Sequence, residues 1–238
     1  MGDAPRVIVV GGGLAGLMTT IRLAEAGMPV DLFSVVPVKR SHSVCAQGGI
    51  NAAVNWKGEG DSPARHFEDT IYGGDFLANQ PPVQAMCEAG PGIIFLLDRM
   101  GVPFNRTPEG LLDFRRFGGT LFHRTAFAGA TTGQQLVYAL DEQVRRHEAA
   151  GLVRKFEGWE LCSLVIDELG RCRGITAMDL RRVALALVVD RAVDAALRAH
   201  RVRAAAGHEG EDIDVLAGLG ELDDGGQHRE AAADDDEA

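Results

Sequence analysis

The chain has 238 residues, of which 46% are hydrophobic, and a formal net charge of −10. This length and apolar content suffice for one sizeable domain or two small ones with a buried core. The acidic balance, without any basic stripe, argues against a nucleic-acid binder. The four cysteines form no CxxC pair and lack metal-ligand spacing to a histidine, which predicts reduced thiols and no metal site.

The N-terminal stretch lacks the basic region, apolar run and cleavage site of a secretory signal. Residues 6–10, "RVIVV", form a short β-branched run that predicts a buried strand. "LAGLMTTIRLAEAG", residues 14–27, predicts a helix, and "PVDLFS", residues 29–34, predicts a second strand. Glycines and charges interrupt this apolar stretch, so it does not predict a membrane span, and membrane association would have to come through a partner.

Three helical regions are predicted next. "DSPARHFEDTIYGG", residues 61–74, has Ser62 or Asp61 as the cap and Pro63 at the first helical position. Residues 80–101 show helical periodicity on both sides of a Gly-Pro-Gly break, which predicts two helices. "TTGQQLVYALDEQVRRHEAAG", residues 131–151, predicts an amphipathic helix capped near its two threonines and ended by its last glycine.

Three strands are then predicted over residues 152–158, 159–168 and 172–180, the last two joined by a turn at Leu169-Gly170. The composition changes near Arg182. Residues 183–238 contain no Ser, Thr, Asn, Lys, Pro, Cys, Met or aromatic residue, and they carry 14 acidic and 5 basic residues. The first part of this segment, with apolar residues at Val189, Val193 and Leu197, favours an amphipathic helix, and the last part favours a disordered acidic tail.

A dinucleotide-binding fingerprint lies between the first strand and the first helix. It consists of Gly11, Gly12, Gly13, Leu14, Ala15 and Gly16. The first glycine permits a tight turn, the third lets a pyrophosphate approach the backbone, and the last lets helix and strand pack closely. The flanking strand and helix make this G-x-G-x-x-G a specific signal for dinucleotide binding.

The expected partner of the ribose departs from the usual pattern. An Asp or Glu is expected about 20 residues after the fingerprint, at the end of the second strand. That strand ends in Phe33-Ser34, with Asp31 inside it. The Ser34 hydroxyl could bond the ribose, although a serine discriminates less than a carboxylate, and this departure leaves FAD open beside NAD.

The loop "RSHSVCAQGGINAAV", residues 40–54, is unusual for a connection. His42 could be an exposed loop residue, a general acid or base, or an attachment point, and the residues alone do not decide between these roles. Gly48 and Gly49 would let a flat aromatic ring lie close to the backbone, and Gln47 could pair with the heteroatoms of that ring. A flavin ring requires such a close contact with the backbone, whereas a nicotinamide ring does not.

Four stretches resemble the flavoprotein subunit of succinate dehydrogenase and fumarate reductase over about residues 6–180. They are "RSHSVCAQGGINAAV", "GDSPARHFEDTIYGGDFLANQPPV", "MCEAGPGIIFLLDRMGVPFNRTPEG" and "RRFGGTLFHRTAFAGATTGQQLVYALDEQ". The resemblance implies an α/β fold: a Rossmann-like FAD-binding domain with a β-meander over residues 1–180, incomplete, followed by a helical or disordered acidic tail over residues 181–238 outside the family.

By this resemblance, His42 carries FAD covalently through the flavin 8α-methyl group, which raises the flavin potential, whereas L-aspartate oxidase lacks this His and holds FAD non-covalently. We expect the cofactor to contact the fingerprint, Ser34 and a set of loop residues. The loop residues are Lys39, Arg40, Ser41, His42, Ser43, Ala46, Gln47, Gly48 and Gly49.

The resemblance further implies oxidation of succinate to fumarate, with electrons passed to an iron–sulfur subunit and on to quinone. It implies a cytoplasmic protein held on the inner face of the bacterial plasma membrane by a membrane anchor subunit. Two alternatives stay open: a non-covalent FAD enzyme of the L-aspartate oxidase or soluble fumarate reductase type, and a non-catalytic flavin-binding module whose acidic tail engages a partner.

The family's substrate and proton-shuttle residues follow the β-meander, and none of their motifs occurs here, so no catalytic residue is assigned. A frameshift or mis-called gene end near Arg182 is the expected origin of the tail, with a genuine alternative terminus as its rival. We expect the chain alone to be marginally stable and not to oxidise succinate. Arg115, Arg116 and Arg124 could contact a dicarboxylate, but structural ion pairs or cofactor phosphate are the commoner partners of such arginines, and His66 and His123 are expected to be structural.

Overall fold

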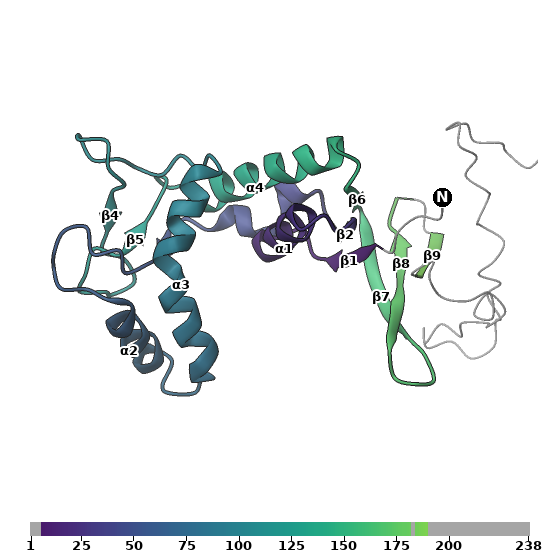
Figure 1. Cartoon of the computed structure of the whole chain (residues 1–238), viewed down its shortest axis with the longest axis horizontal. Helices are drawn as coiled ribbons and strands as arrows, with labels where there is room; N and C mark the ends of the chain where they lie inside the picture. Colours follow the sequence, from purple (N-terminus) through teal and green to yellow (C-terminus); the bar gives the residue numbers. More distant parts are fainter. Residues whose placement is uncertain (1–5, 182–183, 190–238) are drawn as a thin grey trace, which may run out of the picture.

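A computed structural model describes residues 6–181 and 184–189. Its first sheet is parallel and contains strands β1 (Val7–Val10), β2 (Val30–Ser34) and β6 (Val153–Glu157), in the order β1-β2-β6. Strand β2 lies in the centre and all five of its residues are buried, as expected for a parallel strand covered on both faces. Helices α1 (Leu14–Glu25) and α4 (Thr132–Ala149) pack side by side against one face of this sheet (Figure 1).

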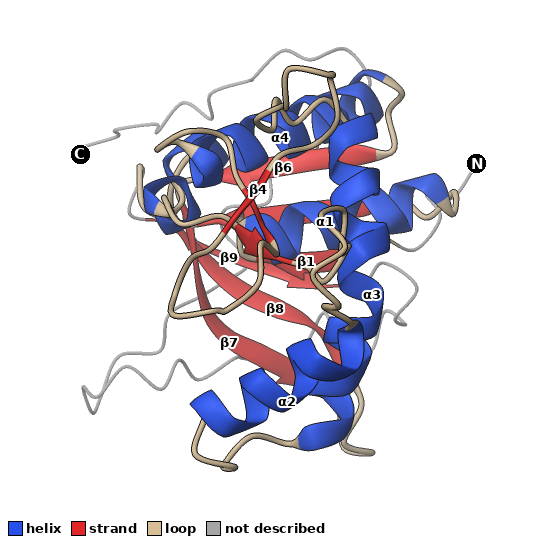
Figure 2. Ribbon diagram, turned by 90° about the vertical axis from the view of Figure 1, so that its left-hand side faces the viewer, coloured by secondary structure: helices blue, strands red, loops and turns tan. Residues whose placement is uncertain are grey.

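The opposite face of the parallel sheet is covered by an antiparallel meander. The meander contains β7 (Trp159–Ile166), β8 (Cys172–Asp179) and β9 (Ala184–Val189). Because side chains alternate along β2, Leu32 joins the core under the helices, whereas Phe33 faces the meander and stacks on Phe156 at 4.5 Å. The result is the predicted α/β unit with a β-meander, and its parallel sheet lies between the helices and the meander (Figure 2).

A second region projects from this unit on the side away from the meander (Figure 1). It contains helices α2 (Pro63–Gly73) and α3 (Gln80–Arg99), and a small antiparallel sheet in the order β3-β5-β4. The strands of this small sheet are β3 (Ile50–Asn51), β4 (Phe114–Arg115) and β5 (Thr125–Ala126). The predicted cap of α2 is confirmed, since the Ser62 hydroxyl accepts a hydrogen bond from the Arg65 amide at 3.2 Å.

Two predictions of secondary structure are wrong. The Gly-Pro-Gly break does not divide residues 80–101, because α3 continues through Pro91. The buried residues Cys87, Gly90, Ile94 and Leu97 lie on one face of α3, and the burial of this continuous face outweighs the backbone hydrogen bond that Pro91 cannot donate.

The helix expected at the start of the acidic segment is also absent from its first residues, which form strand β9. Strand β9 pairs antiparallel with β8, from Gly174 opposite Val189 to Asp179 opposite Ala184. The free edge of β8 supplies hydrogen-bond partners to a short apolar run, and this pairing decides its conformation. The remainder of the predicted tail, with Val193 and Leu197, lies outside the described residues.

Candidate functional site

The fingerprint adopts the predicted strand–turn–helix geometry. Gly11 has a φ of +112°, and its amide donates to the carbonyl of Phe33 at 2.8 Å, which closes the turn after β1. A Cβ on Gly16 would lie 1.8 Å from the carbonyl oxygen of Gly11, so only glycine lets α1 pack this closely on the turn. The space beside Gly11 is open in the described part of the chain, since a Cβ placed there meets no atom of it within 4 Å.

Helix α1 presents a suitable end for an anion. Gly13 is its N-cap residue and offers no side-chain hydrogen bond, and the first turn, which begins with Leu14 and Ala15, contains no acidic residue. The first amide groups of the helix and the positive end of its dipole are therefore available to a phosphate group. This end of α1 lies beside the carboxyl ends of β1 and β2, where open α/β sheets bind their ligands.

The end of β2 provides a serine and no carboxylate. Ser34 is buried, and its hydroxyl donates to the carbonyl of Val36 at 2.6 Å. Asp31 is also buried, but its Oδ1 accepts hydrogen bonds from Arg6 at 2.6 Å and Arg154 at 2.8 Å. The carboxylate inside β2 is thus occupied by two guanidinium groups.

The loop after β2 forms two short 3-10 helices, η1 (Val38–Arg40) and η2 (His42–Cys45). Ser41 lies between them, and its buried hydroxyl has no hydrogen-bond partner among the described residues. His42, Arg40 and Ala46 are exposed, and Ser43 is partly buried. The loop therefore combines an accessible imidazole with an unsatisfied hydroxyl.

Helix α4 holds this loop in place. The amide of Gly133 donates to the carbonyl of Ala46 at 2.7 Å, and a Cβ on Gly133 would lie 2.1 Å from the carbonyl oxygen of Ser43. Thr131 is the N-cap residue of α4, as predicted, although its side chain makes no cap hydrogen bond. The residue of this stretch that contacts the loop is Gly133, which follows the two threonines. The capping pattern of the threonines gives no indication of this contact.

Lys39 is held by the same helix. Its Nζ lies 3.4 Å from the buried carboxylate of Asp141 and 3.4 Å from Glu142, and 5.2 Å from the centroid of the Tyr138 ring. The charge of Lys39 is thus balanced within the protein, which orients η1 against α4.

The Gln-Gly-Gly turn lies against an aromatic ring. A Cβ on Gly48 would be 2.5 Å from the Phe117 ring, and a Cβ on Gly49 would be 2.4 Å from the carbonyl oxygen of Ala126. The Arg115 guanidinium donates to the carbonyls of Gln47 at 3.1 Å and Gly48 at 2.6 Å. The backbone of this turn is therefore approached closely by a flat side chain and fixed from one side by a guanidinium group.

A cavity of about 280 Å³ opens beside this turn. Its lining residues are Gln47, Gly48, Arg115, Phe117, Gly129 and Ala130. The cavity combines backbone carbonyls, an aromatic ring and a positive charge, which is a suitable environment for a planar heteroaromatic group.

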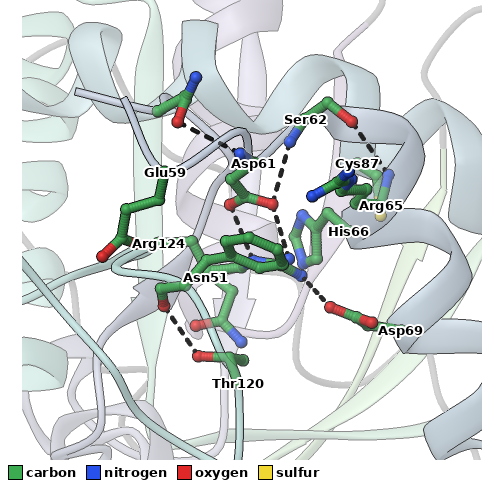
Figure 3. A network of polar contacts seen from close by, with 12 residues as sticks. Asn51, Glu59, Asp61, Ser62, Arg65, His66, Asp69, Cys87, Thr120 and Arg124 are labelled. Atoms are coloured by element: carbon green, nitrogen blue, oxygen red, sulfur yellow. Dashed lines mark hydrogen bonds and ion pairs between the residues drawn. The ribbon is translucent and has the colours of Figure 1, made fainter. Parts of the chain in front are cut away.

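Arg124 has a structural position. Figure 3 shows its guanidinium between two carboxylates. Its Nε and Nη2 donate to Asp61 at 3.0 and 2.7 Å, and its Nη1 lies 2.9 Å from Asp69, while the Arg124 side chain is fully buried. His66 lies beside this group (Figure 3), and burial, followed by the charge of Arg124, lowers its pKa. The prediction that His66 is structural agrees with this position.

Arg116 and His123 converge on Glu59. The Glu59 carboxylate accepts hydrogen bonds from the His123 amide at 2.8 Å and from Arg116 at 3.3 Å, and it lies 2.7 Å from His123 Nδ1. The bond from the His123 amide is the main cause that lowers the pKa of Glu59 to about 2. Among the described residues, no group of His, Cys, Asp and Glu side chains could hold a metal ion, and all four cysteines are free.

The FAD binding domain family matches residues 6–236. The chain is 78% identical over 174 residues to the succinate dehydrogenase flavoprotein subunit of Bacillus subtilis, which covers 73% of this chain and 30% of that protein. It is 35% identical to the fumarate reductase flavoprotein subunit of Mycobacterium tuberculosis, over 73% of this chain and 29% of that protein. The chain thus spans about 30% of the length of these curated relatives.

A solved structure of the E. coli quinol fumarate reductase superposes with a TM-score of 0.72 at 32% identity, covering 78% of this chain and 31% of that chain. The Sdh1 complex of Mycobacterium smegmatis superposes with a TM-score of 0.69 at 28% identity, covering 73% and 31% of the two chains. Within the described residues, no helix has the length and apolarity needed to cross a membrane.

Proposed function

This chain belongs to the FAD binding domain family, and we propose from that premise that it is the FAD-binding part of a succinate dehydrogenase or fumarate reductase flavoprotein subunit. The observation that carries the proposal is the geometry of the turn after β1, where three conditions for a dinucleotide meet. There is open space beside Gly11, the first turn of α1 contains no acidic residue, and Gly16 lets α1 pack closely against the turn.

The chain's own groups fit the two ends of FAD. The amide groups at the start of α1 would bind the pyrophosphate. The buried Ser41 hydroxyl, which has no partner among the described residues, could bond a polar atom of the bound cofactor, because a buried hydroxyl without a partner is costly. The cavity beside Gln47 and Gly48 would receive the isoalloxazine ring, with Arg115 fixing the two carbonyls that line it.

His42 is the proposed attachment point, where an imidazole nitrogen would replace a hydrogen on the 8α carbon of the flavin, and the two electrons and two protons released would be taken up by the flavin ring itself. Two observations support this role. The side chain is exposed, so a ligand in the adjacent site can reach it, and the loop that carries it is fixed to α4 through Gly133 and Lys39. When bound, FAD supplies two-electron redox chemistry, and the protein supplies its orientation and electrostatic environment.

The activity and the partners of the whole protein follow from the relatives. We infer that the complete protein interconverts succinate and fumarate, exchanges electrons with an iron–sulfur subunit, and lies at the inner face of the bacterial plasma membrane through an anchor subunit. The names of the similar succinate dehydrogenase and fumarate reductase proteins support this inference.

The test of attachment is flavin fluorescence in a denaturing gel of the 238-residue chain after acid precipitation. Fluorescence that stays with the band is the expected result, and the His42→Ser variant should lose it while still binding FAD reversibly. His123→Ser is the matched control, since His123 contacts Glu59 and is not placed at the cofactor site. Fluorescence retained by the His42→Ser variant would show that attachment does not occur at this residue.

A further inference from the structure

The end of β2 lacks the carboxylate that dinucleotide-binding folds usually have there. In dinucleotide-binding folds of this type, an Asp or Glu at that place accepts hydrogen bonds from the ribose hydroxyl groups. Here the Ser34 hydroxyl donates to Val36, and the Asp31 carboxylate is occupied by Arg6 and Arg154. Strand β2 therefore offers no free carboxylate to the ribose.

The neighbouring strand supplies one at the same edge of the sheet. Strands β2 and β6 are parallel, and their register places Glu157, the last residue of β6, opposite Ser34. The amide of Gly158 donates to the carbonyl of Ser34 at 2.8 Å, which holds the two strand ends together. Glu157 thus lies at the carboxyl end of the parallel sheet, as the usual acidic residue does, but one strand further from β1.

The Glu157 side chain points back toward the fingerprint. Its Oε1 accepts a hydrogen bond from the Val38 amide at 3.0 Å. Val38 in turn packs against the fingerprint, since a Cβ on Gly12 would lie 2.7 Å from Val38 Cγ1 and 2.6 Å from Ser34 Oγ. Val38 therefore contacts the Glu157 carboxylate through its amide and lies against the glycine turn through its side chain.

One oxygen of this carboxylate remains available. Glu157 is partly buried, and within the described residues its Oε2 accepts no hydrogen bond. A half-buried carboxylate at a ligand-binding edge would gain from a hydroxyl donor, because hydrogen bonds to ionised groups are stronger than neutral ones.

We propose that Glu157 takes the place of the missing carboxylate, with Oε1 holding the Val38 amide and Oε2 accepting the ribose hydroxyl groups of the adenosine half of the dinucleotide. This inference rests on the proposed function, since it concerns the same site. Its ligand class is an adenosine diphosphate moiety with an unmodified ribose, because the carboxylate would repel a 2′-phosphate.

The test compares ADP and FMN as probes, measured by calorimetric titration of the full 238-residue chain. ADP carries the ribose in question, and FMN lacks the adenosine half. In the Glu157→Gln variant, the side-chain carbonyl still accepts from the Val38 amide, but the second acceptor is lost. We expect the affinity for ADP to fall about tenfold, with the affinity for FMN and the melting temperature unchanged.

Glu160→Gln is the matched control, since Glu160 is an exposed carboxylate only three residues further on, and its affinity for ADP should equal that of the wild type. Adenosine 2′,5′-diphosphate should bind the Glu157→Gln variant at least as well as the wild type. Unchanged ADP affinity, or equal losses for ADP and FMN, would overturn the role of Glu157. If the wild-type chain bound neither ADP nor FAD, the proposed function itself would fail.

Discussion

Arg124 and Asp61 form a two-point ion pair, at 3.0 and 2.7 Å, in which both side chains are almost completely buried. Arg124 directly precedes β5, Asp61 precedes α2, and Asp69 on α2 completes the group. The pair therefore ties the small sheet, which continues from the Gln-Gly-Gly turn, to the helical region beside it. Removal of one partner would leave a buried charge with incomplete compensation.

The Asp61→Asn variant is expected to lose about 3–5 kcal/mol of the free energy of unfolding, as measured by urea denaturation. Glu25→Gln provides the comparison, because Glu25 forms an exposed ion pair with Arg22 within one turn of α1. That variant should lose no more than about 0.5 kcal/mol. Equal losses in the two variants would contradict a stabilising role for the buried pair.

Two glycine substitutions should have opposite effects on stability. Gly16→Ala would place a Cβ 1.8 Å from the Gly11 carbonyl oxygen, so we expect a severely destabilised chain. Gly92→Ala adds a Cβ inside α3 that meets no atom of residues 6–181 or 184–189 within 4 Å, and it should stabilise the chain by about 0.5–1 kcal/mol. Thermal denaturation of the two variants measures both changes in stability. A Gly16→Ala variant as stable as the wild type would mean that the turn does not have this geometry.

The pH dependence of stability should depend on His66. Burial, and then the charge of Arg124, lower the pKa of His66 below its ordinary value of 6.5, although Asp61 and Asp69 oppose this shift. Below about pH 6.5 the unfolded chain binds a proton that the folded chain does not bind, so the free energy of unfolding falls as the pH decreases.

Urea denaturation at about pH 7.5 and about pH 5.5 measures this effect. The His66→Gln variant should lose less stability between the two pH values than the wild type does. His42→Gln, at an exposed position, should behave like the wild type in this comparison. An identical pH dependence in the His66→Gln variant and the wild type would exclude His66 as its source.

The 238-residue chain alone is expected not to reduce a dye with succinate. The three arginines considered for a dicarboxylate have other partners: Arg115 the Gln47 and Gly48 carbonyls, Arg116 the Glu59 carboxylate, and Arg124 the Asp61 and Asp69 carboxylates. A spectrophotometric assay of the purified chain measures this activity. Succinate-dependent dye reduction above that of the heat-denatured chain would contradict the expectation.

The elements around the fingerprint, and the start of α2, could be predicted from sequence because their signals are local. The glycine spacing, the β-branched run before it and the Ser62-Pro63 cap each determine the conformation of a few neighbouring residues. The same local rules predict a helix break at Pro91, where burial along one face of α3 keeps the helix continuous. They also predict a helix at Ala184–Val189, where pairing with β8 produces a strand.

The parts of the site that sequence reasoning missed depend on contacts between distant residues. A side chain at position 133 would clash with the carbonyl of Ser43, 90 positions earlier in the chain, because helix α4 approaches it closely. Glu157 becomes relevant only through the register of β6 on β2. One signal was available for Glu157, since a carboxylate at the end of a predicted strand lies at the carboxyl edge of a parallel sheet.

The central claim, that FAD binds at the turn after β1, is tested most directly by the Gly13→Asp variant. Gly13 is the N-cap residue of α1 with a φ of −83°, and among the described residues the only atom within 4 Å of a Cβ placed there is Ser43 Oγ at 3.3 Å. An aspartate at this position would cap the helix and maintain its stability. Its side chain would occupy the pyrophosphate position, however, and its negative charge would repel the phosphate groups.

The measurement is a titration of FAD into the purified chain, followed by flavin fluorescence, with the melting temperature of both proteins as the control for folding. The account predicts that the wild type binds FAD and that the Gly13→Asp variant, with an equal or higher melting temperature, binds it at least about a hundredfold more weakly. Equal affinity for FAD in the two proteins would contradict the claim.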